Sequence, residues 1–256
     1  MTGLKRRNIL GVLAVAPFAA SAAAAAQPQP RCDINEGTRS TSNDWPNLTR
    51  YSADNAALQV SAKSVDVVFM GDSITQGWPD KRPTFFNDGR ICRGIGGQTT
   101  PQMVLRMRPD VIALKPKLVH IMAGTNDIAG NTGPMTPAQT IDNLESMVIL
   151  AQAYGITVVV GSIPPAANFP WRPGLETAQA IFALNGAISR MVKKRAAIFV
   201  DYTASLSDGM GRMKQGYAYD GVHPDVNGYA AMEAVLEPII AASCEPLYRQ
   251  LRTIGT

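Results

Sequence analysis

Residues 65–79 read VDVVFMGDSITQGWP, an apolar run that ends abruptly at Gly71-Asp72-Ser73. A continuous run of Val, Phe and Met that is bounded by Gly is typical of a strand buried on both faces of a parallel sheet. Whatever follows such a strand lies at the carboxyl edge of the sheet, which is where open α/β sheets carry their functional sites. The polar triplet is therefore the first candidate site.

Apolar runs of the same kind recur along the chain and alternate with helical periodicity. Strands are expected near residues 65–70, 90–93, 118–123, 156–161 and 197–201, and helices at about 48–59, 101–114, 137–154, 175–194 and 226–242. This alternation predicts an α/β protein with one doubly wound parallel sheet, a three-layer α/β/α sandwich of about five strands in a single domain. The sequence contains no internal repeat.

The composition is that of a globular protein. The chain has 256 residues, of which 46% are hydrophobic and 17% are charged, so it can bury a substantial core. Its formal charge is +4, but Lys5, Arg6 and Arg7 fall in a predicted leader, and the other 21 basic residues against 20 acidic ones leave about +1. This charge balance indicates no nucleic-acid partner.

Residues 1–26 have the features of a secretory signal peptide. Lys5-Arg6-Arg7 precedes an apolar stretch, and Ala24-Ala25-Ala26 supplies an A-x-A cleavage site. The paired arginines favour twin-arginine export, although general secretion fits almost as well, and an uncleaved membrane anchor is the alternative. We expect an exported protein, periplasmic or secreted, with no stable membrane insertion after cleavage. The predicted organisation continues with a linker over residues 27–44, a globular domain over 45–246 and a tail over 247–256.

Export implies an oxidising compartment, so the three cysteines require an interpretation. Cys32 follows the leader and Cys244 follows the last predicted helix, which makes a disulfide between Cys32 and Cys244 plausible. Cys92 lies in a short strand-like stretch and is expected to be a buried thiol. The chain has two histidines and no Cys-x-x-Cys or His-x-x-x-His spacing, so no metal site is predicted.

Four short polar stretches stand at strand ends or in the last loop. They are Gly71-Asp72-Ser73, Gly94-Ile95-Gly96-Gly97, Gly124-Thr125-Asn126-Asp127 and Asp220-Gly221-Val222-His223-Pro224. If the sheet is parallel, the first three converge at one edge, and the fourth precedes the last helix and can fold over that edge. Their convergence predicts a single composite site.

Ser73 is the candidate nucleophile of this site. A serine needs a base within hydrogen-bond reach, and only His120 and His223 are available. His120 lies inside a predicted strand and is interpreted as a core histidine. His223 lies in a loop with Asp220 three residues before it, so a turn can set the carboxylate against the imidazole and hold its tautomer.

Nucleophilic attack on an ester also needs donors for the oxyanion that forms. The main-chain N–H groups of Ser73 and of a glycine within residues 94–97, with the side-chain amide of Asn126, are the candidates. Taken singly, Gly71-Asp72-Ser73 also fits an ordinary strand–helix turn, residues 94–97 a tight turn, and Asn126-Asp127 a helix N-cap. Gly94-x-Gly96 also resembles part of a dinucleotide loop, but Thr99 stands where a third glycine would be needed.

The four stretches in this order resemble the SGNH, or GDSL, hydrolase superfamily. The matches are Gly71-Asp72-Ser73-Ile74, with Ile in place of the usual Leu, Gly97 as the oxyanion glycine, the Asn126 block and the Asp220 to His223 block, and the likeness covers about residues 45–242. The resemblance implies a flavodoxin-like α/β/α ester hydrolase. It also implies Ser73 as nucleophile, His223 as base, Asp220 as the group that orients it, and no cofactor or metal.

The substrate is less constrained by the sequence than the reaction. Trp78, Phe169, Trp171 and Arg172 are candidates for lining the pocket, although aromatic loop residues also pack against their own scaffold. With no long apolar lid segment and an exported chain, removal of a short acyl group, above all acetyl, from a small ester or an acetylated glycan is the leading hypothesis. The alternatives are a lysophospholipase-like, thioesterase-like or arylesterase activity, an acyltransferase and an inactive glycan-binding protein.

Overall fold

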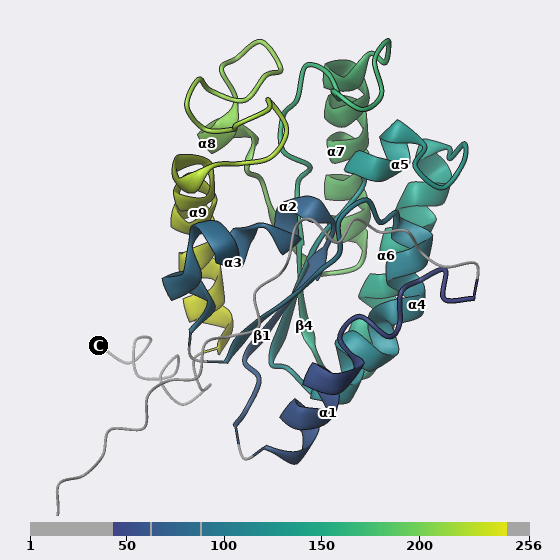
Figure 1. The fold of residues 1–256 in the computed structure, drawn as a ribbon, viewed down its shortest axis with the longest axis vertical. Coiled ribbons are helices and arrows are strands. Elements are labelled where there is room, and N and C mark those ends of the chain that lie inside the picture. Colours follow the sequence, from purple (N-terminus) through teal and green to yellow (C-terminus); the bar gives the residue numbers. More distant parts are fainter. Residues whose placement is uncertain (1–42, 62, 88, 245–256) are drawn as a thin grey trace, which may run out of the picture. The chain divides into compact units, whose positions relative to one another are not determined.

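The computed structural model describes residues 43–61, 63–87 and 89–244. Its strands are β1 (Val67–Gly71), β2 (Arg90–Gly94), β3 (Leu118–Met122), β4 (Thr157–Gly161) and β5 (Ile198–Val200). All pair in parallel in the order β2-β1-β3-β4-β5, and helices lie on both sides of the sheet (Figure 1). The predicted three-layer α/β/α fold with about five parallel strands is confirmed. The predicted leader, residues 1–26, lies outside the described residues.

The strand β1 shows why the apolar run forms a central strand. Its side chains from Val67 to Met70 are fully buried, and they alternate between the two core layers. The register aligns Gly71 with Gly94 of β2 and with Met122 of β3. The residues that follow these three strands therefore emerge together at the carboxyl edge, where the strand order changes direction.

One face of the sheet carries α1 (Ser52–Val60), α4 (Thr100–Asp110), α6 (Pro137–Ala153) and α7 (Thr177–Lys194) (Figure 1). Both α4 and α6 begin with a capping box, formed by Thr99 with Gln102 and by Thr136 with Gln139, and each has Pro in its first turn. Their buried side chains recur at helical spacing and join the apolar strand residues in one core layer.

The other face carries α9 (Val226–Cys244), α3 (Trp78–Lys81), α8 (Thr203–Leu206) and the 3-10 turn η1 (Pro83–Phe86) (Figure 1). Here α9 buries Tyr229, Met232 and Leu236. The hydroxyl of Tyr229 donates to the carbonyl oxygen of Ile74 at 2.7 Å. The last helix is thereby tied to the turn that carries the candidate nucleophile.

Trp78 belongs to this second core layer and not to a substrate pocket. Its side chain is fully buried, and its ring stacks on Phe85 and Tyr229, each at a centroid distance of 5.3 Å. Its Nε1 donates to Oε1 of Glu233 at 3.0 Å, and Glu233 also pairs with Arg82. The sequence-based assignment of Trp78 to the pocket is wrong, because the short helix α3 turns this side chain toward the sheet.

The short elements at the edges of the sheet were not predicted from the sequence. They are α2 (Ser73–Gln76), α3, η1, α5 (Thr125–Ala129) and α8, whereas the helix expected at about 101–114 is divided into α4 and the 3-10 turn η2 (Ile112–Leu114). Elements of three to five residues do not complete enough turns to show a helical period. Across the described ranges, no helix is long and apolar enough to cross a membrane.

Candidate active site

Ser73 is the first residue of α2, directly after β1. Asp72 caps this helix, because its Oδ1 accepts from the N–H of Ile74 at 2.9 Å. The turn is tight enough that a Cβ at Gly71 would lie 2.0 Å from Oγ1 of Thr75 and 2.7 Å from the carbonyl oxygen of Met122. Glycine at position 71 therefore lets Ser73 stand at the centre of the carboxyl edge.

The hydroxyl of Ser73 contacts the imidazole of His223. Ser73 Oγ lies 2.8 Å from His223 Nε2, and His223 Nδ1 lies 2.7 Å from Oδ2 of Asp220. A proton on Nδ1 that donates to the carboxylate leaves Nε2 free to accept from the serine hydroxyl. This arrangement can deprotonate the hydroxyl during attack on a carbonyl carbon.

The loop that carries His223 is folded by its own carboxylate. Asp220 Oδ1 accepts from the main-chain N–H groups of Val222 at 3.0 Å and of His223 at 2.8 Å, and Gly221 takes a φ of 83° between them. Partial burial acts to raise the pKa of Asp220, but these hydrogen bonds and the one to the imidazole outweigh it and hold that pKa below its ordinary value. Asp220 is therefore a carboxylate when it contacts His223.

Three groups around Ser73 have the chemistry of oxyanion donors. In the described part of the chain, the main-chain N–H groups of Ser73 and Gly97 donate to no other group, whereas that of Gly96 donates to Oε1 of Gln76. Gly97 takes a φ of 73°, a conformation that favours glycine. Asn126, on α5, is buried, and its Nδ2 lies 3.1 Å from the carbonyl oxygen of Gln98.

Gly94, the other glycine considered for this role, has a packing function. A Cβ at this position would lie 2.3 Å from the main-chain nitrogen of Gln76 and 2.7 Å from the carbonyl carbon of Thr75. The end of β2 and the helix α2 therefore approach each other closely only because residue 94 has no side chain. This contact holds the Gly97 loop beside the Ser73 turn.

Two buried carboxyl groups lie next to the candidate site, on Asp72 before Ser73 and on Asp127 after Asn126. Burial raises the pKa of Asp72 to about 6, against the opposing hydrogen bond from Ile74. Asp127 accepts from the main-chain N–H of Thr100 at 3.1 Å and from Oγ1 of Thr140 at 3.3 Å, and burial raises its pKa. Asp127 thus joins the loop after β3 to the start of α4.

His120 lies in the core, as its position inside a strand predicts. It is fully buried, its Nε2 lies 2.9 Å from the hydroxyl of Tyr202, and burial lowers its pKa to about 3. His120 is therefore neutral at ordinary pH.

Of the two aromatic residues predicted to line the site from the loop after β4, one is buried and one is exposed. Phe169 is buried and stacks under Trp171 at a centroid distance of 5.1 Å, so its assignment to the pocket surface is wrong. Trp171 is 40% exposed and its ring lies 5.9 Å from that of His223. Arg172 follows it on the surface, and its N–H donates to the carbonyl oxygen of Phe169 at 2.8 Å.

Tyr219 is a residue at the site that the sequence analysis missed. Its ring is stacked against that of His223 at a centroid distance of 5.6 Å and an interplanar angle of 13°, and 63% of the residue is exposed. The only signal in the sequence is its position immediately before Asp220, which no periodicity marks.

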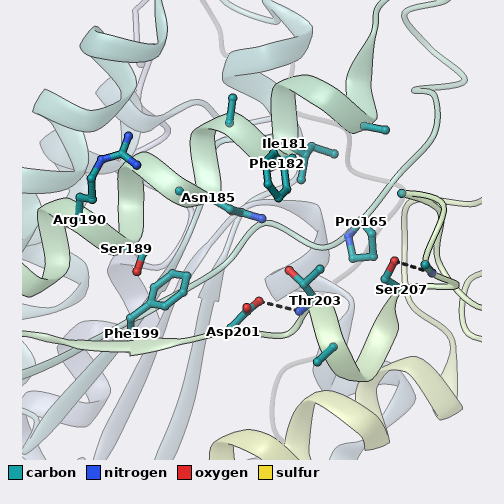
Figure 2. Close-up of a pocket in the computed structure, with 16 residues that line it drawn as sticks. Pro165, Ile181, Phe182, Asn185, Ser189, Arg190, Phe199, Asp201, Thr203 and Ser207 are labelled. Carbon is teal, nitrogen blue, oxygen red and sulfur yellow. Dashed lines mark hydrogen bonds between the residues drawn. The ribbon is translucent and has the colours of Figure 1, made fainter.

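A cavity of about 930 Å³ lies elsewhere, between α7, the edge strand β5 and α8 (Figure 2). Its lining includes Ile181, Phe182, Asn185, Phe199 and Asp201, and contains none of Ser73, Asp220 and His223. In Figure 2 the side chains of Phe182 and Asn185 project from α7 toward Thr203 of α8. The cavity is separate from the residues that surround the serine.

Neither of the two cysteines within the described residues takes part in the contacts among Ser73, His223 and Asp220. Cys92, in β2, is buried, and its Sγ lies 3.3 Å from the carbonyl oxygen of Thr75. Cys244 ends α9, whereas Cys32 lies outside the described residues, so the Cys32–Cys244 disulfide stays a prediction. Over residues 43–61, 63–87 and 89–244, no group of three or more His, Cys, Asp or Glu side chains is arranged to hold a metal ion.

The protein is similar to several proteins of known structure. A putative acylhydrolase from Bacteroides fragilis is 42% identical with a TM-score of 0.74, covering 79% of this chain and 99% of that one. A GDSL-like lipase from Bacteroides thetaiotaomicron is 44% identical with a TM-score of 0.73, covering 77% and 98%. An acetylxylan esterase from Geobacillus stearothermophilus, at 20% identity and a TM-score of 0.54 over 70% of this chain and 94% of its own, shares the fold.

One curated protein also matches, over a shorter stretch. It is an uncharacterized lipoprotein, YqeF, from Bacillus subtilis, 40% identical over 79 residues, which are 25% of this chain and 32% of that protein. The family model of the GDSL-like lipase/acylhydrolase family matches residues 69–231, which begin in β1 and end in α9. The chain therefore belongs to the GDSL-like lipase/acylhydrolase family.

Proposed function

We propose that this protein is a serine ester hydrolase that removes short acyl groups, above all acetyl, from hydroxyl groups of carbohydrate. The observation that carries the proposal is the chain of contacts from Ser73 Oγ to His223 Nε2 at 2.8 Å and from His223 Nδ1 to Asp220 Oδ2 at 2.7 Å. A hydroxyl, an imidazole and a carboxylate in this order are the groups that acyl transfer through a serine requires.

In the first half of the proposed reaction, Ser73 Oγ attacks the ester carbonyl carbon while its proton passes to His223 Nε2. The carbonyl oxygen becomes an oxyanion that the N–H groups of Ser73 and Gly97 and the amide of Asn126 stabilise. The bond to the alcohol oxygen then breaks, and this oxygen takes the proton from Nε2. In the second half, water loses a proton to His223 Nε2 and attacks the acyl-serine. The bond between the acyl carbon and Ser73 Oγ then breaks, Oγ takes the proton back from Nε2, and the carboxylic acid leaves.

The alcohol part of the substrate must lie beside the imidazole, because its oxygen receives the proton from Nε2. The exposed rings of Trp171 and Tyr219 lie within 5.9 Å and 5.6 Å of the imidazole ring. Aromatic faces that border a site suit the flat face of a sugar or an aryl group. This placement supports a ring alcohol as the leaving group, and Arg172, the residue after Trp171, is the candidate partner for its polar substituents.

The loops at the carboxyl edge of the sheet support a short acyl group in the substrate. In the described part of the chain, the loops at the carboxyl edge contain no long apolar segment of the kind that covers a lipid chain. A small acyl group in an open site is consistent with this surface. One protein with the same fold is an acetylxylan esterase, which agrees with acetyl as the acyl group.

An arylesterase is the second candidate, since the rings of Trp171 and Tyr219 accept an aryl alcohol as readily as a sugar. A lysophospholipase-like or thioesterase-like hydrolase, an acyltransferase and an inactive glycan-binding protein are the remaining alternatives. Export through the predicted leader, residues 1–26, is part of the proposal, and the matched relative that is named a lipoprotein supports it. An exported deacetylase would meet acetylated glycans outside the cytoplasm.

Labelling with an organophosphonate followed by peptide mass spectrometry tests the serine. We expect stoichiometric modification of Ser73 and none in Ser73→Ala. Modification at another residue would overturn the assignment of Ser73, and no modification of the wild-type protein would favour the glycan-binding alternative. Rates on esters with acyl chains from C2 to C12, and on acetylated xylan, then test the substrate: a preference for C10 or C12 would contradict the deacetylase.

A further inference from the structure

The proposed oxyanion donors come from loops that are separate in the sequence. Gly97 belongs to the loop after β2, and Asn126 lies on α5 after β3. Donors of this kind stabilise charge only when they are held within a few tenths of an ångström of the oxyanion position. Something must therefore fix the two loops relative to each other.

Asn131 contacts both donors with one side-chain nitrogen. Its Nδ2 donates to Oδ1 of Asn126 at 2.8 Å and to the carbonyl oxygen of Gly97 at 3.3 Å. An amide nitrogen carries two hydrogens, so a single Asn side chain can make both bonds. Asn131 thereby bridges the side chain of Asn126 and the carbonyl oxygen of Gly97, which belongs to the peptide group that follows the proposed donor N–H.

The end of α5 brings Asn131 to this position. The helix stops at Gly130, which takes a φ of 69° in the left-handed region. The N–H of Gly130 donates to the carbonyl oxygen of Asp127, and that of Asn131 donates to the carbonyl oxygen of Asn126, both at 3.1 Å. The chain is folded back on α5, so Asn131 returns to the residue that it orients.

The bond to Oδ1 decides how the Asn126 amide is oriented. With Oδ1 held by Asn131, Nδ2 points to the carbonyl oxygen of Gln98 at 3.1 Å and to Oδ2 of Asp72 at 3.4 Å. A flipped amide would set its NH₂ against that of Asn131 and its oxygen against two acceptors. Asn131 therefore keeps the NH₂ end of the Asn126 amide, and not its oxygen, directed at Gln98 and at Asp72, the residue before Ser73.

We propose that Asn131 is a positioning residue of the oxyanion hole, which aligns Asn126 and Gly97 without touching the substrate. This inference rests on the proposed function. A second bond joins the same two loops, because Oγ1 of Thr99 lies 2.8 Å from Oγ1 of Thr132. Thr132 contacts neither donor in this way, so it provides a matched control for loop attachment alone.

The experiment compares Asn131→Ala, Asn131→Asp and the control Thr132→Val. For each we would measure kcat and KM on p-nitrophenyl acetate, the rate of inactivation by an organophosphonate, and the melting temperature. We expect Asn131→Ala to lower kcat by about tenfold to a hundredfold, with KM within about twofold and the inactivation rate lowered in parallel. Asn131→Asp should lose as much, because an ionised carboxylate cannot donate.

Thr132→Val should keep kcat near that of the wild-type protein at a comparable melting temperature. Equal losses in Thr132→Val and Asn131→Ala, or a kcat of Asn131→Ala within twofold of wild type, would overturn the positioning role and leave the hydrolase intact. Wild-type protein that neither hydrolyses the ester nor reacts with the organophosphonate would overturn the proposed function, and the role of Asn131 with it.

Discussion

Ser73 Oγ and His223 Nε2 lie 2.8 Å apart although 150 residues separate them in the chain. The serine is carried by the turn after the central strand β1, and the histidine by the loop that leads into α9. Only the complete sheet with its last helix in place brings the two together. The contact is thus a product of the whole fold, and each of its partners can be tested separately.

Asp220→Asn tests the carboxylate behind the histidine. An amide at this position can hold Nδ1 in the wrong tautomer, so we expect kcat on p-nitrophenyl acetate to fall by about three to four orders of magnitude. Asp208→Asn is the control, because it removes the same charge at a different place, where Asp208 pairs with Arg212 in an exposed loop. A loss below tenfold in Asp220→Asn, or an equal loss in both variants, would show that Asp220 does not serve His223.

Tyr219→Ala and Trp171→Ala test recognition of the alcohol. An aromatic contact contributes about 1 kcal/mol, so we expect kcat/KM on an acetylated xylooligosaccharide to fall about fivefold for each variant, and that on ethyl acetate to stay unchanged. Tyr154→Ala, which removes an exposed ring at the end of α6, is the matched control. Equal losses of kcat/KM on both substrates would show that these rings do not recognise the alcohol.

Gly94→Ala tests the close approach between β2 and α2. Its Cβ would lie 2.3 Å from the nitrogen of Gln76, and since the obstacle is backbone, we expect the free energy of unfolding to fall by about 3 kcal/mol or more. Gly186→Ala in α7 should raise it by about 0.5–1 kcal/mol, because the nearest atom would be Nη1 of Arg190 at 3.5 Å. Urea unfolding of both variants measures the contrast, and a Gly94→Ala protein as stable as wild type would refute the packing role.

Because burial raises the pKa of Asp72, we expect the stability of the protein to depend on pH. Burial raises its pKa from 3.8 to about 6, so between these values the folded protein retains a proton that the unfolded chain has released. The free energy of unfolding should therefore fall as the pH rises from about 4 to about 6, by roughly 3 kcal/mol at most. Asp72→Asn removes this titration and keeps an acceptor for the N–H of Ile74.

Urea unfolding at pH 4, 5, 6 and 7 measures the effect. The stability of Asp72→Asn relative to wild type should increase with pH over this range. Asp142→Asn, which removes an exposed carboxyl on α6, is the control for the loss of one negative charge. A constant difference between Asp72→Asn and wild type would indicate that Asp72 ionises alike in the folded and unfolded states.

The sequence predicted the features that depend on long or strongly patterned segments. The apolar run of β1, buried on both faces, has no good alternative to a central parallel strand, and the helices over α6 and α9 show a full helical period. The convergence of Ser73 and Asn126 follows from parallel strands alone, because their positions after β1 and β3 leave them at one edge.

The features that sequence reasoning missed depend on the directions of single side chains. Trp78 and Trp171 are both aromatic residues close to site motifs, but α3 turns the first into the core and the loop after β4 leaves the second exposed. Tyr219 and Asn131 contact the site through loop geometry, which is set by the left-handed conformations of Gly221 and Gly130. No periodicity encodes such turns, so only coordinates identify these two residues.

The hydrogen bond from Tyr229 to the carbonyl oxygen of Ile74 has a consequence for the order in which the protein becomes competent. Ser73 and every strand precede His223 and α9 in the chain, so a chain still missing its last segment has the serine without the imidazole that contacts it. Docking of α9 completes the site, and under the proposed function a chain that lacks this helix would be inactive.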